Sequence, residues 1–214
     1  MYSQLMIPTF AEGERARVMA EIAAATDRLD AVSKLFAPTL PGVYNGGDAI
    51  WRVTFADKAA RDTALANEAW APVAALLNDR AVTTHLNTVG FPSGRIGGPA
   101  EGGGLYRVAL FCANVRPTVE RLEAFAAQTA SMPNAIKTIR RWQLARGEHA
   151  RGDKPWNTVW EQEYADLGGL NGAYMLHPAH WAHVERWFDT EYPEWLVDPV
   201  LVHTFCAIDR PAIA

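Results

Sequence analysis

The residues best suited to chemistry lie close together, between Tyr174 and His183. This segment holds one tyrosine and three histidines around Pro178. Proline lacks a backbone N–H and disfavours helical geometry in the residue before it, so we expect a kink at His177 and a new helix that starts near Pro178. His180 falls within the apolar face of this helix, and His183 lies nearer its edge. The apolar face consists of Trp181, Val184, Trp187 and Phe188.

A histidine surrounded by indole rings and aliphatic carbon loses hydration, which favours the neutral imidazole. A neutral imidazole accepts a proton, as a general base must. His180 is therefore a candidate general base, and the kink would let Tyr174 lean over the same cavity to hydrogen-bond a developing enolate. The alternative interpretation is structural. In it, His180 packs in the core with one satisfied hydrogen bond, and Tyr174 is an interface aromatic.

The spacing of His177, His180 and His183 is also compatible with a metal site, because imidazoles three residues apart can share a helix face. Two features argue against this interpretation. Pro178 interrupts the helix between the first two histidines, and the nearest carboxylates in sequence lie off this face. The sequence therefore predicts no metal and no other cofactor.

Tryptophan is concentrated in the second half of the chain, which holds six of the eight residues of this type. Indole rings on the open face of a sheet would line an aromatic cavity for a flat, largely apolar ligand. We expect such a cavity between two packed sheets. The side chains expected to contact the ligand are His177, His203, Trp160, Trp181 and Trp187.

Composition narrows the classes of partner. The chain has 214 residues, of which 49% are hydrophobic and 21% charged, with a net charge of −4. The cationic residues are scattered, which argues against a nucleic-acid partner. The sequence has neither a secretory leader pattern nor a run of apolar residues long enough to span a membrane, so we expect a cytoplasmic protein with a small-molecule ligand. Cys112 and Cys206 lie in apolar runs, where we expect buried thiols.

A segment rich in glycine and proline, residues 92–104, divides the chain nearly in half. Glycine is unconstrained and proline lacks a donor, so this segment is not expected to hold regular structure. We therefore expect a first unit at residues 1–91, a linker at 92–104 and a second unit at 105–214 that carries the candidate site.

Each unit shows the same order of elements, β-α-β-β-α-β. The first unit has expected strands at 2–10, 32–39, 49–55 and 81–89 and expected helices at 12–29 and 58–77. The second unit has expected strands at 105–113, 136–144, 157–164 and 200–208 and expected helices at 118–130 and 170–188. The run from Trp51 to Asp57 also parallels the run from Trp160 to Asp166, which indicates an internal duplication.

A β-α-β-β-α-β unit forms a four-stranded antiparallel sheet with both helices on one face. The uncovered faces of two such sheets would bury each other. The sequence therefore predicts an α+β fold in which two fused ferredoxin-like units form one internally duplicated α/β barrel, so that one chain supplies what single units obtain by dimerising.

On this order of elements and on the pattern Tyr-x-x-His-Pro-x-His at residues 174–180, the chain resembles two copies of the dimeric α/β-barrel (Dabb, stress-responsive A/B barrel) domain, the second copy more clearly. The pattern is also similar to that of olivetolic acid cyclase-like members of the family. In those members the tyrosine and the last histidine serve a cofactor-free aldol cyclisation of a polyketide. The resemblance assigns these roles to Tyr174 and His180.

The resemblance is incomplete elsewhere. Further pocket histidines of those members do not transfer, because the corresponding strands here offer Arg107 or Tyr106, and Thr158. In the first unit, Thr63 and Ala69 stand where the tyrosine and histidine would be, so we expect the equivalent region there to be filled or blind.

Two functions follow from the sequence. The first is a cofactor-independent lyase or cyclase that acts on an aromatic or polyketide-like carbonyl compound, with His180 as general base. The second is a non-catalytic, small-molecule-binding or stress-responsive barrel. For either function, the sequence is compatible with a homodimer.

Overall fold

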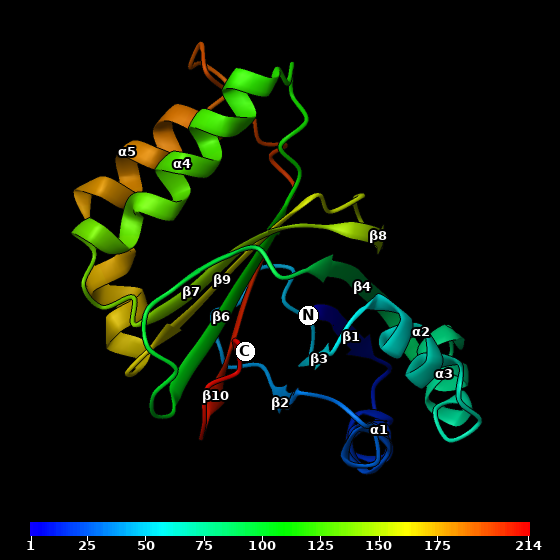
Figure 1. Cartoon of the computed structure of the whole chain (residues 1–214). Helices are drawn as coiled ribbons and strands as arrows, with labels where there is room; N and C mark the ends of the chain where they lie inside the picture. The colour runs from blue at the N-terminus through cyan, green and yellow to red at the C-terminus, as the bar shows by residue number, and fades with distance from the viewer.

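The computed structural model describes all 214 residues and contains two antiparallel sheets of five strands each (Figure 1). The order in the first sheet is β2-β3-β1-β4-β8, and the order in the second is β10-β6-β9-β7-β5. The strands of the first sheet are β1 (Tyr2–Phe10), β2 (Ser33–Pro38), β3 (Ala49–Phe55), β4 (Thr83–Pro92) and β8 (Glu148–Arg151). Those of the second are β5 (Arg95–Gly97), β6 (Gly104–Phe111), β7 (Arg141–Arg146), β9 (Thr158–Tyr164) and β10 (Val202–Ile208).

The helices cover the outer faces of the two sheets (Figure 1). Next to the first sheet lie α1 (Arg15–Asp27), α2 (Lys58–Ala66) and α3 (Ala71–Asn78). Next to the second lie α4 (Val119–Ala135), a π-helix η1 (Gly169–Tyr174) and α5 (Pro178–Phe188). The predicted α+β fold with an internal duplication is confirmed, because each sheet carries its own helical layer.

The inner faces of the sheets share one core, as the sequence predicts. Side chains alternate between the two faces of a strand, so each strand contributes every second residue to this core. Buried members of the inner core include Leu5 and Val89 from the first sheet and Val108, Leu110 and Val159 from the second. Two further cores lie between each sheet and its own helices.

The sheets also exchange edge strands. β5 follows the last long strand of the first sheet in sequence, but it pairs with β7 of the second sheet. In return, β8 follows β7 in sequence and pairs with β4 of the first sheet. The expectation that residues 92–104 hold no regular structure is therefore wrong, because β5 gains its hydrogen-bond partners from a distant strand, which local propensity does not reveal.

Other element boundaries also differ from the sequence-based expectations. The single helix expected at 58–77 is two helices, because Asn67 Oδ1 accepts a hydrogen bond from the Ala69 amide at 2.8 Å and turns the chain between them. The expected helix at 118–130 continues to Ala135, and the expected strand at 136–144 starts only at Arg141. Ile136 and Ile139 are apolar because they pack in the core beneath α4.

A buried polar network joins the sheets. The guanidinium of Arg52 in β3 donates to Glu161 of β9 at 2.5 and 3.3 Å, and both side chains are fully buried. Glu161 also accepts from Tyr106 at 2.5 Å. The C-terminal segment closes this region, because the amides of Ala212 and Ile213 donate to Glu163 at 2.8 Å.

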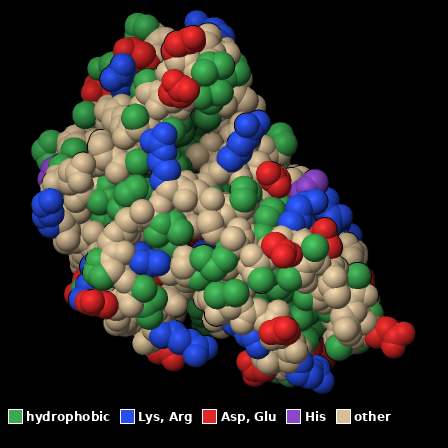
Figure 2. Space-filling view, in the orientation of Figure 1, with side chains coloured by type: hydrophobic (Ala, Val, Ile, Leu, Met, Phe, Trp, Pro, Cys, Tyr) green, Lys and Arg blue, Asp and Glu red, His purple; other side chains and the backbone are tan.

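The distribution of surface charge and the character of the helices concern two kinds of partner, nucleic acids and membranes. On the face shown in Figure 2, Lys and Arg side chains are dispersed among acidic and apolar ones rather than gathered in one band. None of the helices combines the length and the apolar character needed to cross a bilayer.

Candidate functional site

A cavity of about 200 Å³ lies between the second sheet and helices α4 and α5. Strand alternation creates it, because Arg107 of β6, Trp160 of β9 and His203 of β10 all face the helical side. The expectation of a cavity between the sheets is wrong for this site, since the interface there is filled by the shared core. The remaining polar and aromatic lining comes from Phe111, Thr129, Tyr174, His180, Trp181, His183 and Phe188.

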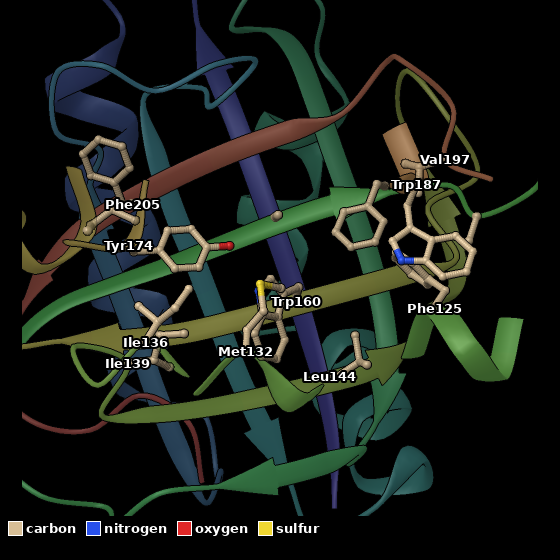
Figure 3. Close-up of a cluster of buried hydrophobic side chains, with 14 of the residues drawn as sticks. Phe125, Met132, Ile136, Ile139, Leu144, Trp160, Tyr174, Trp187, Val197 and Phe205 are labelled. Carbon is tan, nitrogen blue, oxygen red and sulfur yellow. The ribbon is translucent and has the colours of Figure 1, made fainter. Parts of the chain in front are cut away.

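The π-helix positions Tyr174. Its wide turn is seen in the bond from the Met175 amide to the Leu170 carbonyl at 2.9 Å, which spans five residues. Only 2% of Tyr174 is exposed, and its ring centroid lies 4.5 Å from that of His180. Figure 3 shows the Tyr174 hydroxyl directed towards the centre of the surrounding cluster rather than towards solvent. The sequence-based pair therefore meets in one cavity.

The predicted kink is present, and His177 forms it. Its Nδ1 accepts a hydrogen bond from the Ala179 amide at 3.1 Å, so the ring caps the first turn of α5. His177 does not line the cavity. The structure therefore gives His177 a local structural role in place of the expected ligand contact.

The expected tryptophan contacts divide into two groups. Trp160 lies at the wall of the cavity, and Trp181 lies at its rim with 53% of its surface exposed. Trp187 is buried in the core, where its indole N–H donates to Gln128, and it does not line the cavity. The buried residues of α5 are His180, His183 and Trp187, so His180 and Trp187 lie on the buried face as expected, whereas Trp181 does not.

Burial and a nearby cation keep three histidines neutral. Burial, with Arg107 second, lowers the pKa of His180 to about 4. Burial, followed by Arg107 and His180, lowers the pKa of His203 to about 3. Burial lowers the pKa of His183 to about 3 as well, with His180 and Arg186 as smaller causes. All three imidazoles are neutral at pH 7 and can accept protons.

The tautomer of His183 follows from its neighbours. The hydroxyl of Thr129 donates to the Phe125 carbonyl at 2.8 Å, so its oxygen accepts from Nε2 of His183 at 3.3 Å. Nδ1 of His183 is then an acceptor, and it is buried without a hydrogen-bond partner. The ring also stacks on Phe125 at 5.4 Å, which fixes its plane. His183, expected near the edge of the face, is in fact part of the cavity wall.

Several lining residues were not identified as site residues from the sequence. In the sequence, Arg107 stands only as a mismatch to the histidines of the family pattern, and no pattern marks Thr129 or Met132. The pairing of β6 with β9 shows how Arg107 could have been assigned to the site. Arg107 pairs with Gln162 of the adjacent strand, and Gln162 follows Trp160 by two residues. Once the face of β9 that carries Trp160 is known, all three side chains can be placed on that face.

The first unit has a corresponding site without the same chemistry. By strand register, Gln4 takes the position of Arg107 and Thr88 that of His203. The region around Thr63 and Ala69, expected to be either filled or blind, is not filled. These small side chains line a cavity of about 400 Å³ that contains neither a histidine nor a tyrosine. Gln4 and Thr88 line a separate cavity of about 550 Å³.

The side chains do not form a metal centre. No group of three or more histidine, cysteine, aspartate or glutamate residues is arranged to hold a metal ion. Among the three histidines near Pro178, the ring of His177 is turned away to cap α5. The chemistry available in the cavity is therefore that of neutral imidazoles, a phenol and one guanidinium.

Comparison with known proteins identifies part of the chain directly. Residues 105–197 match the family described as the Stress responsive A/B Barrel Domain, abbreviated Dabb. No curated protein matches the chain. The match covers the strands and helices that build the cavity, except for β10.

Solved structures share the fold of the whole chain at low sequence identity. An anthrone oxidase-like protein is 11% identical with a TM-score of 0.71, over 99% of this chain and 92% of that one. A protein from Fusobacterium nucleatum, provisionally described as a monooxygenase, is 8% identical with a TM-score of 0.67, over 100% and 95%. A similarly described protein from Lactobacillus acidophilus is 12% identical with a TM-score of 0.61, over 99% and 95%. At these identities the likeness establishes the fold alone.

Proposed function

We propose that the second unit of the chain, whose residues 105–197 match the Dabb family, is an enzyme acting on an aromatic or polyketide-like carbonyl compound. The reaction is a cofactor-independent cyclisation or lyase-type step that begins with the removal of a proton next to the carbonyl. His180 is the general base, and Tyr174 hydrogen-bonds the enolate oxygen. The observation that carries the proposal is the 4.5 Å separation of these two rings in a mostly apolar cavity.

The first step needs only these two side chains. The C–H bond breaks, its electron pair moves into the enolate, and the proton passes to a ring nitrogen of His180. The Tyr174 hydroxyl donates a hydrogen bond to the enolate oxygen, where negative charge develops. In a cyclisation, the enolate carbon then attacks a second carbonyl of the same molecule. The resulting alkoxide takes the proton back from His180.

The low pKa of His180 is consistent with this role. Its value of about 4 reflects burial and the Arg107 cation beside the ring. An enolate that forms next to the ring favours the imidazolium, so the base strength of His180 rises as negative charge develops. The neutral form that must accept the proton is fully populated at pH 7.

A second function is supported by the same pKa values. His180, His183 and His203 are all weak bases before a ligand anion forms, so the cavity can also hold a ligand without removing a proton from it. Such a protein would hold the same class of ligand but would not accelerate proton removal. Binding without proton exchange distinguishes it from the enzyme.

The names of the structural neighbours suggest another fate for the carbanion. One neighbour is described as anthrone oxidase-like, and two are provisionally described as monooxygenases. In an oxygenation, the carbanion reacts with O₂ instead of a second carbonyl. Proton removal by His180 would be the shared first step of both reactions.

Anthrone provides a test of that first step, because its methylene protons are activated by a conjugated carbonyl. We expect the native protein to accelerate exchange of these protons for deuterium in D₂O, measured by NMR under argon. Repeating the assay in air shows whether O₂ is consumed. Binding of anthrone without accelerated exchange would support the non-catalytic barrel instead.

A further inference from the structure

Arg107 is the most unusual residue of the cavity. It lies in the middle of β6, is 7% exposed and lines the cavity. Its Nη1 donates to the side-chain oxygen of Gln162 at 2.7 Å, whereas its Nε is buried without a hydrogen-bond partner. Its guanidinium carbon also lies 5.6 Å from the centroid of the Tyr174 ring. A buried guanidinium with an unpaired N–H has unused hydrogen-bonding capacity.

No carboxylate compensates this charge. The cavity lining contains no Asp or Glu, and Arg107 forms no ion pair. The nearest acidic residues on the neighbouring strand, Glu161 and Glu163, alternate with Gln162 and point to the opposite face. There they are engaged by Arg52 and by the amides of Ala212 and Ile213. A buried charge without an ionic partner is costly, so an anion that entered the cavity would stabilise Arg107.

In the first unit, the residue at the position equivalent to Arg107 has hydrogen-bond partners for its polar atoms. Gln4, which has the register position of Arg107, is neutral. Its amide nitrogen donates to Thr88 at 2.7 Å, and its oxygen accepts from Arg61 at 3.1 Å. The duplicated fold therefore does not require a cation at this position. A cation on the sheet at this position is found only in the second unit, whereas the first-unit cavity takes a cation, Arg61, from α2, and that cation pairs with Asp62.

We propose that Arg107 binds a carboxylate of the ligand, so that the second-unit cavity selects an aromatic or polyketide-like acid over its neutral analogues. The inference deepens the proposed function and rests on it, because it assigns the acidic group of the same ligand. The guanidinium fork matches the two oxygens of a carboxylate. Trp160 Nε1 and His203 Nε2 are also buried without partners and provide additional polar contacts.

The two parts of the site then have separate tasks. Arg107 anchors the acidic end of the ligand, while His180 and Tyr174 act at the carbonyl-bearing end. Arg107 is a specificity-determining residue in this arrangement. Its charge also lowers the pKa of His180 and His203, so ligand binding at Arg107 and proton removal are electrostatically linked.

A matched pair of ligands tests the inference. The probes are 2-naphthoate and 2-naphthamide, which share a flat bicyclic ring and differ in charge. Binding is measured by calorimetry and by quenching of tryptophan fluorescence, since Trp160 and Trp181 line the cavity. We expect the native protein to bind the acid at least tenfold more tightly than the amide. Arg107→Gln should bring the affinity for the acid down to that for the amide, while Arg107→Lys should retain part of the preference.

The control is Arg61→Gln, which removes a cation that lines a cavity of the first unit and should leave the preference for the acid unchanged. NMR titration gives an independent readout: the pKa values of His180 and His203 should rise in Arg107→Gln. Equal affinity of the native protein for acid and amide would overturn the inference but leave the proposed function intact. Failure of the acid to bind the cavity would also overturn the inference, whereas the anthrone exchange assay tests the proposed function separately.

Discussion

At the scale of single residues, the three buried histidines make stability depend on pH. His180, His183 and His203 have pKa values of about 4, 3 and 3 in the folded state. An unfolded histidine has a pKa near 6.5, so the unfolded chain binds more protons between these values. Stability is therefore fully present above about pH 6.5 and is lost as the pH falls towards 4. The loss is at most about 1.4 kcal/mol per histidine for each pH unit.

Denaturant unfolding at pH 7 and pH 5 measures this loss. We compare the native protein with a variant in which all three histidines are replaced by asparagine, because other groups titrate in both proteins. The native protein should lose more stability between the two pH values than the variant. Equal losses would show that the histidines are protonated in the fold as readily as in the unfolded chain.

Single residues also show how much of the site can be predicted from the sequence. The meeting of Tyr174 and His180 was predictable, because Pro178 fixes the start of α5 and the apolar pattern fixes its buried face. The position of Arg107 was not. Residues of β6 alternate between the two faces of the sheet, and Arg107 is one of those that face the helices. Because apolar residues occupy both faces of β6, the sequence does not reveal which residues face which side.

At the scale of elements, the contact between β3 and β9 depends on the buried pair Arg52 and Glu161. Glu161→Ala would leave the guanidinium buried without its charge partner. Such a loss typically costs about 3–5 kcal/mol, so we expect a decrease of this size in the free energy of unfolding. The matched control is Glu21→Ala, which removes an exposed partner of Arg17 and should cost less than about 1 kcal/mol.

Chemical denaturation of both variants provides the measurement. A cost below about 1 kcal/mol for Glu161→Ala would contradict the central place of the ion pair in the sheet interface. Because Glu161 faces away from the cavity, binding of ligands near His180 should change little in a folded Glu161→Gln protein.

The elements that the sequence failed to predict share a physical cause. Both β5 and β8 are short, and each is stabilised by a strand from the other half of the chain. Hydrophobic periodicity reports local amphipathicity, so it cannot reveal pairing that depends on such distant contacts. By contrast, β1 and β3 are found at the residues expected, because each is a long run rich in apolar and β-branched residues that ends before a break in this pattern.

At the scale of the whole molecule, the shared core and the exchanged strands predict one cooperative unit. Neither sheet can separate without exposing the inner core and breaking the pairing of β5 and β8. We therefore expect a single transition in calorimetry. Solution scattering should give a radius of gyration of about 17 Å per compact chain, the value typical of a globular domain of this length.

Two separate transitions, or an elongated particle with two lobes, would contradict this prediction. The division into units at residues 92–104 is itself still a prediction, and so are a homodimer and a cytoplasmic location. The homodimer can be tested by sedimentation, because a chain that closes its own inner core does not need a second copy to bury it.

The most direct test of the account is the rate of anthrone proton exchange in His180→Asn relative to the native protein. Asparagine keeps much of the shape of the side chain but cannot act as the base, so the rate should fall by about 10²–10⁴ while the melting temperature changes little. Variants at Thr63 and Ala69, which line the first-unit cavity, should exchange at the native rate. An unchanged exchange rate in folded His180→Asn protein that still binds anthrone would contradict the central claim.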